Sequence, residues 1–176
     1  MSGHNKWSKI KNKKAVTDAQ KSKIFSKLVR FITIESKKAK GGVDSPGLRA
    51  AILKAKAENV PNDNIDRAVK KGAGGEGGDL TSVTYECYGP GGSAIIIEAL
   101  TDNNNRTSQE IKHLLSENGF ELAAPGSAIW TFEKQGNDWQ AKNMTSISEE
   151  DGQKLSDLIE QLEEHDDVQE VFTNAE

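Results

Sequence analysis

Five glycines within residues 72–78 divide this chain of 176 residues into two parts. The run Gly72-Ala73-Gly74-Gly75-Glu76-Gly77-Gly78 favours a flexible linker, because glycine loses more conformational freedom on folding than other residues do. A more specific alternative is a phosphate-binding loop. That loop requires a following Gly-Lys-Ser/Thr between a strand and a helix, and the sequence has neither. We therefore expect two domains, residues 1–71 and residues 79–176, joined by the linker 72–78.

The two parts carry opposite charge. Residues 1–71 contain 18 Lys and Arg against 6 Asp and Glu, whereas the remaining residues contain 5 against 21. Residues 1–40 are the most basic, with 11 Lys and 1 Arg against Asp18 and Glu35. A polyanion is the natural partner of such a segment, because each Lys or Arg placed on a phosphate releases a condensed counterion. The alternative is a basic face that is only solvated and has no partner. The aromatic residues Trp7 and Phe25 among the lysines favour binding of a polyanion over this alternative.

The basic part has the spacing of helices. Ile24, Leu28 and Ile32 recur on one helical face and predict a helix over residues 17–40, which Gly41-Gly42 ends. A second helix is expected to begin near Ser45-Pro46, since proline suits a first turn.

Val60-Pro61 should end that second helix, because proline removes a hydrogen-bond donor and restricts the residue before it. Asn62 is then expected to cap a third helix that stops at Lys70-Lys71-Gly72. Three short amphipathic helices can bury one another's apolar faces, so we predict a three-helix domain.

Residues 1–16 show little periodicity and are rich in lysine, which suggests an arm that orders on a partner. Lysine contacts phosphate as a point charge, whereas arginine pairs with guanine through two hydrogen bonds, so the lysine excess favours backbone contacts over base readout. Trp7 either stacks on a base or packs against the protein. The arm and the first helix together supply the candidate nucleic-acid-binding residues, Lys6, Trp7, Lys9, Lys11, Lys13, Lys14, Lys21, Lys23, Lys27 and Arg30.

The acidic part begins with the pattern of a β-hairpin. Val83, Tyr85 and Cys87 alternate with polar residues, and Gly89-Pro90-Gly91-Gly92 then turns the chain into an apolar run over 94–100. The glycine-rich turn superficially matches a dinucleotide-binding fingerprint. We reject this match, because the turn leads into a strand and offers no helix N-terminus to bind a pyrophosphate.

The rest of the acidic part alternates helices and strands. Thr107-Ser108-Gln109-Glu110 fits a capping box for a helix ending at Asn118-Gly119, and residues 128–132 are expected to form a strand, with a weaker one near Trp139. Ser148 should cap a last helix, and residues 168–172 should form a closing strand. This order predicts an α+β protein, a three-helix domain followed by a ferredoxin-like antiparallel α/β domain.

Residues suited to catalysis or metal binding are scattered. His4, His113 and His165 do not stand at metal-ligand spacing with a third donor, and the acidic run at 163–167 is expected to be a solvated helix end. The single cysteine, Cys87, excludes an internal disulfide and is expected to be a small buried residue. We therefore expect no catalytic site, no metal, no cofactor and no small-molecule substrate.

The sequence also bears on location. No stretch approaches the eighteen or so apolar residues of a membrane span, and the N-terminus lacks the apolar or arginine-rich segment of a targeting signal. We expect a cytoplasmic protein without membrane contact. The sequence does not indicate an oligomeric state.

Several blocks of the sequence match one known family. They include Tyr85-Glu86-Cys87-Tyr88-Gly89-Pro90-Gly91-Gly92 and Thr101-Asp102-Asn103-Asn104-Asn105-Arg106-Thr107, and they also cover residues 3–11, 23–30, 59–68 and 166–174. On these blocks the chain resembles the YebC/PmpR family, which includes the mitochondrial translational activator of cytochrome oxidase. One departure stands out: family members have an extra α/β domain before the final helix, where this chain has only residues 134–148. The chain therefore resembles a short form.

The resemblance implies a helical domain followed by an α/β domain and a role in gene expression. Bacterial members are described as transcriptional regulators, so a DNA-binding transcriptional regulator is the leading hypothesis. A ribosome- or RNA-associated translation factor is the alternative, since other relatives are tied to translation. A protein–protein adaptor with an acidic docking surface is the third hypothesis.

Overall fold

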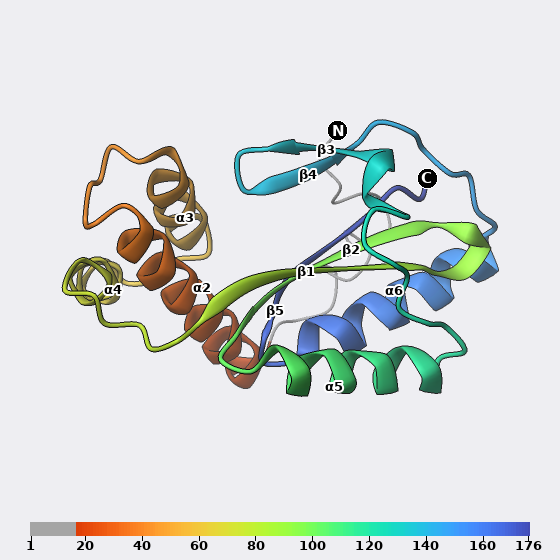
Figure 1. Cartoon of the computed structure of the whole chain (residues 1–176), viewed down its shortest axis with the longest axis horizontal. Helices are drawn as coiled ribbons and strands as arrows, with labels where there is room; N and C mark the ends of the chain where they lie inside the picture. Colours follow the sequence, from red (N-terminus) through yellow and green to blue (C-terminus); the bar gives the residue numbers. More distant parts are fainter. Residues whose placement is uncertain (1–16) are drawn as a thin grey trace. The chain divides into compact units, whose positions relative to one another are not determined.

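The computed structural model describes residues 17–176, which form two compact units, residues 17–81 and residues 82–176. The first unit contains three helices, and the second contains the strands and the remaining helices (Figure 1). The α+β fold class predicted from the sequence is confirmed. None of the helices in these residues is both long enough and apolar enough to cross a bilayer.

Helix α2 spans Asp18–Lys38, as the apolar spacing predicts. A capping box fixes its start: Thr17 Oγ1 accepts from the backbone N–H of Gln20, and Gln20 Oε1 accepts from the backbone N–H of Thr17. At its other end, the Gly41 N–H bonds the Ser36 carbonyl at 2.9 Å with Gly41 at φ 77°, a left-handed conformation that glycine adopts readily.

Helices α3, Pro46–Ala57, and α4, Asn62–Ala73, complete the first unit. Proline stands in the first turn of α3, and the break between the two helices falls at Val60-Pro61, as predicted. The expectation that Asn62 caps α4 is wrong. Pro61 occupies the N-cap position, so Asn62 is already the first helical residue, and no side chain caps this helix.

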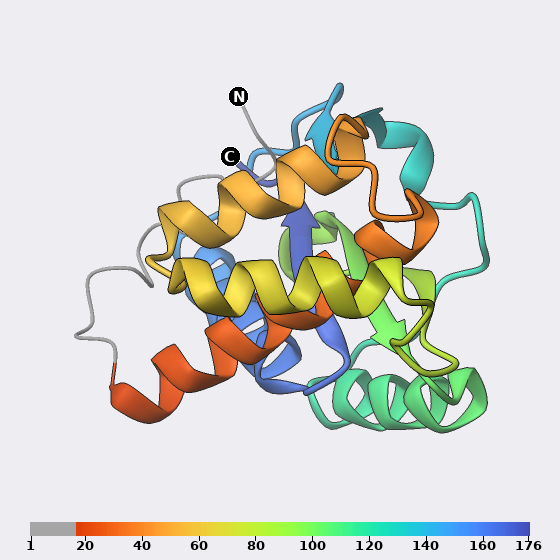
Figure 2. The same ribbon diagram turned by 90° about the vertical axis from the view of Figure 1, so that its left-hand side faces the viewer.

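Figure 2 shows the three helices side by side. Their core includes Ile32 of α2, Leu48 of α3 and Ile65 of α4. Helices α2 and α4 approach closely at Gly72, where an added Cβ would lie 2.3 Å from the Thr33 carbonyl oxygen. Sequence analysis assigned Gly72 to the linker, but α4 continues through Ala73. Gly72 is therefore a residue of the helix interface.

The second unit begins with the predicted hairpin. Strand β1, Thr81–Tyr88, and strand β2, Ala94–Thr101, are neighbours in a sheet and are joined by the short 3-10 helix η1, Pro90–Gly92. Strand β5, Val168–Thr173, pairs antiparallel with β2 on its other side, which gives the sheet order β1-β2-β5.

Both faces of β2 are buried. Ile95 and Ile97 pack with α5, Asn104–Glu117, and α6, Glu149–Glu164, whereas Ile96 packs with Phe132 on the opposite face. The alternation follows from the two-residue period of a strand. Figure 1 accordingly shows α5 and α6 on one side of the sheet and the hairpin of β3, Phe132–Gln135, and β4, Asp138–Ala141, on the other.

Two local expectations in this unit are wrong. Residues 129–131 form the 3-10 helix η2, Ile129–Thr131, instead of a strand, and β3 starts only at Phe132. The weaker strand expected near Trp139 is confirmed as β4, which pairs with β3 in a separate two-stranded sheet. Helix α5 starts three residues before the predicted capping box, because the side chain of Asn103 accepts from the Arg106 N–H and supplies the cap. The caps at Ser148 and at Asn118-Gly119 lie where they were predicted.

Candidate nucleic-acid interface

Helix α2 carries four of the basic side chains selected from the sequence. Lys21 is exposed, and Lys23, Lys27 and Arg30 are half-buried. Long basic side chains at half-buried positions bury their aliphatic stems while their charged ends reach solvent. The remaining candidates, Lys6, Trp7, Lys9, Lys11, Lys13 and Lys14, lie outside the described residues.

An open groove of about 670 Å³ is lined by α2, by α4 and by the segment that follows α4. Four cations contribute to its lining, Lys21 and Arg30 from α2 and Arg67 and Lys71 from α4. The lining contains one carboxylate, that of Asp18. The electrostatic potential in the groove is therefore positive, which suits an anion.

The apolar part of the groove is more buried than three of its four cations, Lys21, Arg67 and Lys71. Ala68 is buried, and Phe25 and Val29 are partly buried and packed on the core of the helical unit, yet all three line the groove. The side chains of Arg67 and Lys71 are exposed. A group that entered the groove would thus meet charge at the edge and apolar surface beneath it.

The groove includes only part of the predicted set. Lys21 and Arg30 line it, whereas Lys23 and Lys27 do not. At about 100° per residue, Lys23 and Lys27 fall outside the face of α2 that carries Phe25 and Val29. A role for these two lysines in binding stays a prediction.

Sequence reasoning missed Arg67 and Lys71. These residues stand four apart on α4, so they share one face of the helix. The spacing is visible in the sequence, but only the packing of α4 on α2 turns this face toward the basic face of α2. Among residues 17–176, neither Arg67, Lys71 nor Lys21 forms an ion pair with another side chain.

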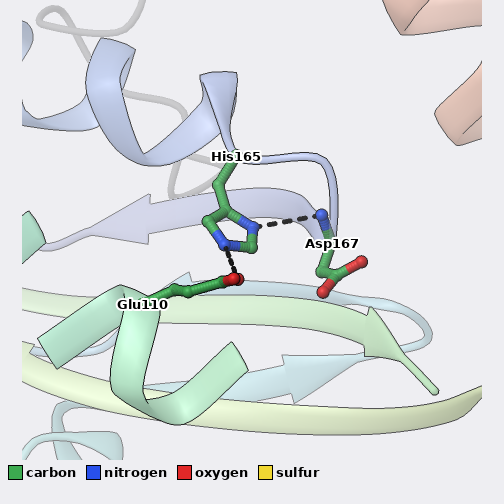
Figure 3. A group of neighbouring side chains, drawn as sticks. All are labelled: Glu110, His165 and Asp167. Carbon is green, nitrogen blue, oxygen red and sulfur yellow. Dashed lines mark hydrogen bonds and ion pairs between the residues drawn. The ribbon is translucent and has the colours of Figure 1, made fainter. Parts of the chain in front are cut away.

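A second cluster of charged residues lies in the other unit. Glu110, His165 and Asp167 each place one potential ligand atom within 4.8 Å of the others (Figure 3). The backbone N–H of Asp167 donates to His165 Nδ1 at 3.1 Å, and His165 Nε2 lies 2.8 Å from Glu110 Oε2. Because a backbone N–H can only donate, Nδ1 accepts, and the proton of the neutral ring sits on Nε2 facing Glu110.

This arrangement fits a structural network better than a cation site. Asp167 is 5% exposed, and its Oδ2 accepts from Arg106 at 2.7 Å and from Thr107 at 2.8 Å. A metal at His165 would have to displace the Nε2 proton, and it would lie near the Arg106 guanidinium. The neighbouring Asp167 carboxylate in turn raises the pKa of Arg106 above its usual value. The cluster joins α5 to the turn between α6 and β5.

Two other residues considered for chemistry, Cys87 and His113, lie in the α+β unit. Cys87 is fully buried, and burial raises its thiol pKa to about 12, so it stays protonated at neutral pH. The expectation of a small buried cysteine is confirmed. His113 is exposed and lies 3.3 Å from Glu117 on the same helix.

Three helices with a cation-lined groove, followed by an antiparallel sheet with helices on one face, define the class: this is a two-unit α+β protein. The sequence pattern of the TACO1/YebC N-terminal domain matches residues 5–75, and that of the TACO1/YebC second and third domains matches residues 80–137 and 137–175. The chain belongs to the TACO1/YebC family.

Relatives and a solved structure agree with this assignment. A "Probable transcriptional regulatory protein" of Petrotoga mobilis is 43% identical over 186 residues, covering 100% of this chain and 71% of the relative. One of the same name from Thermotoga petrophila is 53% identical over 138 residues, covering 77% of this chain and 54% of the relative. The crystal structure of a conserved hypothetical protein from Aquifex aeolicus has a TM-score of 0.81 at 33% identity, covering 98% of this chain and 97% of that one.

The comparisons also bear on the shortened region. A relative from Kosmotoga olearia is 38% identical over an alignment of 240 positions that covers 100% of this chain and 94% of the relative. Since this chain has 176 residues, the relative carries positions with no counterpart here. The two matched segments of the second and third domains meet at residue 137, inside the stretch 134–148 where the sequence analysis put the missing domain.

Proposed function

We propose that this protein is a non-enzymatic regulator of gene expression that binds nucleic acid through its basic helical unit. The observation that supports this most strongly is the gathering of Lys21, Arg30, Arg67 and Lys71 around one groove. Phosphates are the anions that such a set serves best, because several cations can each release a counterion from one backbone. The lysine-rich residues 1–16 lie outside the described residues, and their 5 lysines are a second, independent part of this proposal.

Transcriptional regulation through DNA is the leading form of this proposal, and the names of the relatives support it. Association with the ribosome or with RNA, as a translation factor, is the second form. The 11 Lys against 1 Arg in residues 1–40 weigh against sequence-specific reading of DNA, because lysine-dominated contacts position a protein on phosphates without reading base pairs. Crosslinking in cells followed by sequencing of the bound nucleic acid separates the two forms.

A salt titration of the full-length protein tests the interface on α4. Replacing Arg67 and Lys71 by Ala should flatten the slope of log K against log salt by about 1.8 on duplex DNA, because each phosphate that a cation neutralises contributes ~0.9 to the slope. The matched control is Lys70→Ala, since Lys70 is exposed on the same helix but does not line the groove. Because the control removes one charge and the variant removes two, a change of about 0.9 in the control would mean that the groove has no special part in binding.

The same titration tests the N-terminal residues. The triple replacement of Lys11, Lys13 and Lys14 by Ala should reduce the slope by about 2.7 on duplex DNA, at ~0.9 for each lysine that neutralises a phosphate. Affinity should fall nearly uniformly across base sequences. A slope equal to that of the wild type would mean that these lysines do not bind phosphates, and that binding is carried by α2 and α4.

A further inference from the structure

We propose that the groove between α2 and α4 binds an unpaired nucleotide of a single-stranded segment, with its phosphates on the cations and its base against the apolar lining around Phe25. This inference rests on the proposed function and names the form of nucleic acid that this site takes.

The groove combines two surfaces that a duplex cannot use together. In a duplex the bases are stacked and paired inside, so a cationic surface meets phosphates and groove edges. The apolar side chains of Phe25, Val29 and Leu80 would then face charge or water and gain nothing. An unpaired base instead offers an apolar aromatic face, and aromatic side chains commonly stack on it.

The size and depth of the groove agree with this occupant. Its volume of about 670 Å³ falls within the range of about 300–1,000 Å³ that is typical of pockets for small organic groups. The apolar residues are buried or partly buried, whereas Lys21, Arg67 and Lys71 are exposed. The backbone of a strand would therefore lie along the edge while one base enters the interior.

Polar groups of the lining supply partners for the base. Asn64 of α4 lines the groove, and its amide both donates and accepts, as the polar edge of any base requires. Ser22 and Ser26 of α2 add hydroxyl groups. Four cations against the single carboxylate of Asp18 disfavour cationic ligands.

The test measures affinities of the full-length protein for labelled oligothymidylate, oligouridylate and a blunt DNA duplex of the same length. Phe25→Ala should weaken binding to the single strands by roughly 5- to 150-fold, equivalent to about 1–3 kcal/mol for a stacked base, and leave duplex affinity unchanged. The salt slope should not change, since Phe25 carries no charge. Phe25→Trp should retain single-strand binding, and Phe25→Leu, which keeps the core filled, should lose most of it.

Phe31→Ala is the control for packing, because Phe31 is partly buried against the same core but does not line the groove. An equal loss in Phe31→Ala, or an equal loss on duplex and single strand in Phe25→Leu, would overturn the proposal. Displacement of the strand by polyglutamate at equal charge would also overturn it, since the groove would then be a general anion site. The two single strands distinguish DNA from RNA.

The outcome is separable from that of the proposed function. If Arg67→Ala and Lys71→Ala lower affinity and slope while Phe25→Leu binds single strands as the wild type does, this inference fails and the proposed function stands. A wild-type protein that binds none of the three probes refutes both.

Discussion

The two units of this protein use their charged residues in opposite ways. In the helical unit, exposed Lys21, Arg67 and Lys71 border a groove and form no ion pair within residues 17–176. In the α+β unit, the carboxylates of Glu86 and Asp167 are buried and hold backbone or side-chain donors. Part of the negative charge of the second unit thus stabilises its own fold, whereas Lys21, Arg67 and Lys71 are not used in ion pairs of the described residues.

Glu86 illustrates the structural use of a carboxylate. It is 6% exposed, and its two oxygens accept from the backbone N–H groups of Gly126, Ala128 and Ile129 at 2.7–2.8 Å. A buried charge is costly unless hydrogen bonds replace its hydration, and three donors do so here. These bonds hold the loop that leads into η2. Glu86 itself lies in the block Tyr85–Gly92, which the sequence analysis matched to the family.

The largest effect is expected at the helix crossing of the basic unit. Gly72→Ala should destabilise the protein by about 3 kcal/mol, although alanine normally favours a helix over glycine by ~1 kcal/mol. The reason is that the new Cβ would lie 2.3 Å from the Thr33 carbonyl oxygen and 2.9 Å from the Lys37 nitrogen, which are backbone atoms. Urea denaturation measures the change.

The matched control is Gly74→Ala, where the added Cβ would meet its nearest atoms at 3.5 Å and φ is −74°. This variant should be neutral or slightly stabilised. Equal stability of the two variants would show that Gly72 belongs to the linker after all, and that the α2–α4 groove does not depend on a close crossing.

The contrast between the units also shows what the sequence could predict. The helices of the first unit and the strand alternation of β1 and β2 follow from apolar spacing, which is a local signal. The role of Gly72 and the approach of Arg67 and Lys71 to α2 depend on how helices pack, which no local pattern encodes.

The errors have the same origin. Residues 128–132 have the composition of a strand. The backbone N–H groups of Ala128 and Ile129 instead donate to Glu86 Oε2, and residues 129–131 form a 3-10 turn. The sequence around Thr107 fits a helix cap, but Thr107 lies within the first turn of α5, and its buried hydroxyl donates to Asp167 Oδ2. Both outcomes depend on partners about 40 or more residues away in the sequence, and hydrogen bonds to a buried carboxylate outweigh local propensity.

A smaller effect is expected when Glu86 is neutralised. Glu86→Gln keeps the shape but exchanges one acceptor oxygen for a donor, which then faces a backbone N–H. We expect a loss of about 2 kcal/mol, the cost of leaving a buried polar group unpaired. Hydrogen exchange should quicken at Gly126, Ala128 and Ile129, while nucleic-acid affinity stays unchanged.

Glu133→Gln is the control for this change, since Glu133 is exposed on β3. It should leave stability and exchange as they are. A change in nucleic-acid affinity in Glu86→Gln but not in Glu133→Gln would contradict the division of labour between the two units.

The last effect concerns a neutral group of the α+β unit, is absent at neutral pH and appears only in alkali. Burial raises the thiol pKa of Cys87 from 9.0 to about 12, so the unfolded chain releases this proton at a lower pH than the folded protein does. The stabilisation is therefore complete below pH 9 and is lost as pH rises toward 12. The free energy of unfolding should fall by about 1.4 kcal/mol for each pH unit in this window.

Comparison with Cys87→Ala isolates the thiol, because other groups that titrate in alkali are present in both proteins and cancel in the difference. Cys87→Ala should have lower stability at neutral pH, since it leaves space in the core around Ile95 and Leu155, and the gap to the wild type should narrow above pH 9. The measurement is urea denaturation at a series of pH values. A gap that stays constant up to pH 12 would mean that the thiol ionises as easily in the folded protein as in the unfolded chain. The core on the helix side of the sheet would then be open to water, and the contrast between a closed acidic unit and an open basic groove would no longer hold.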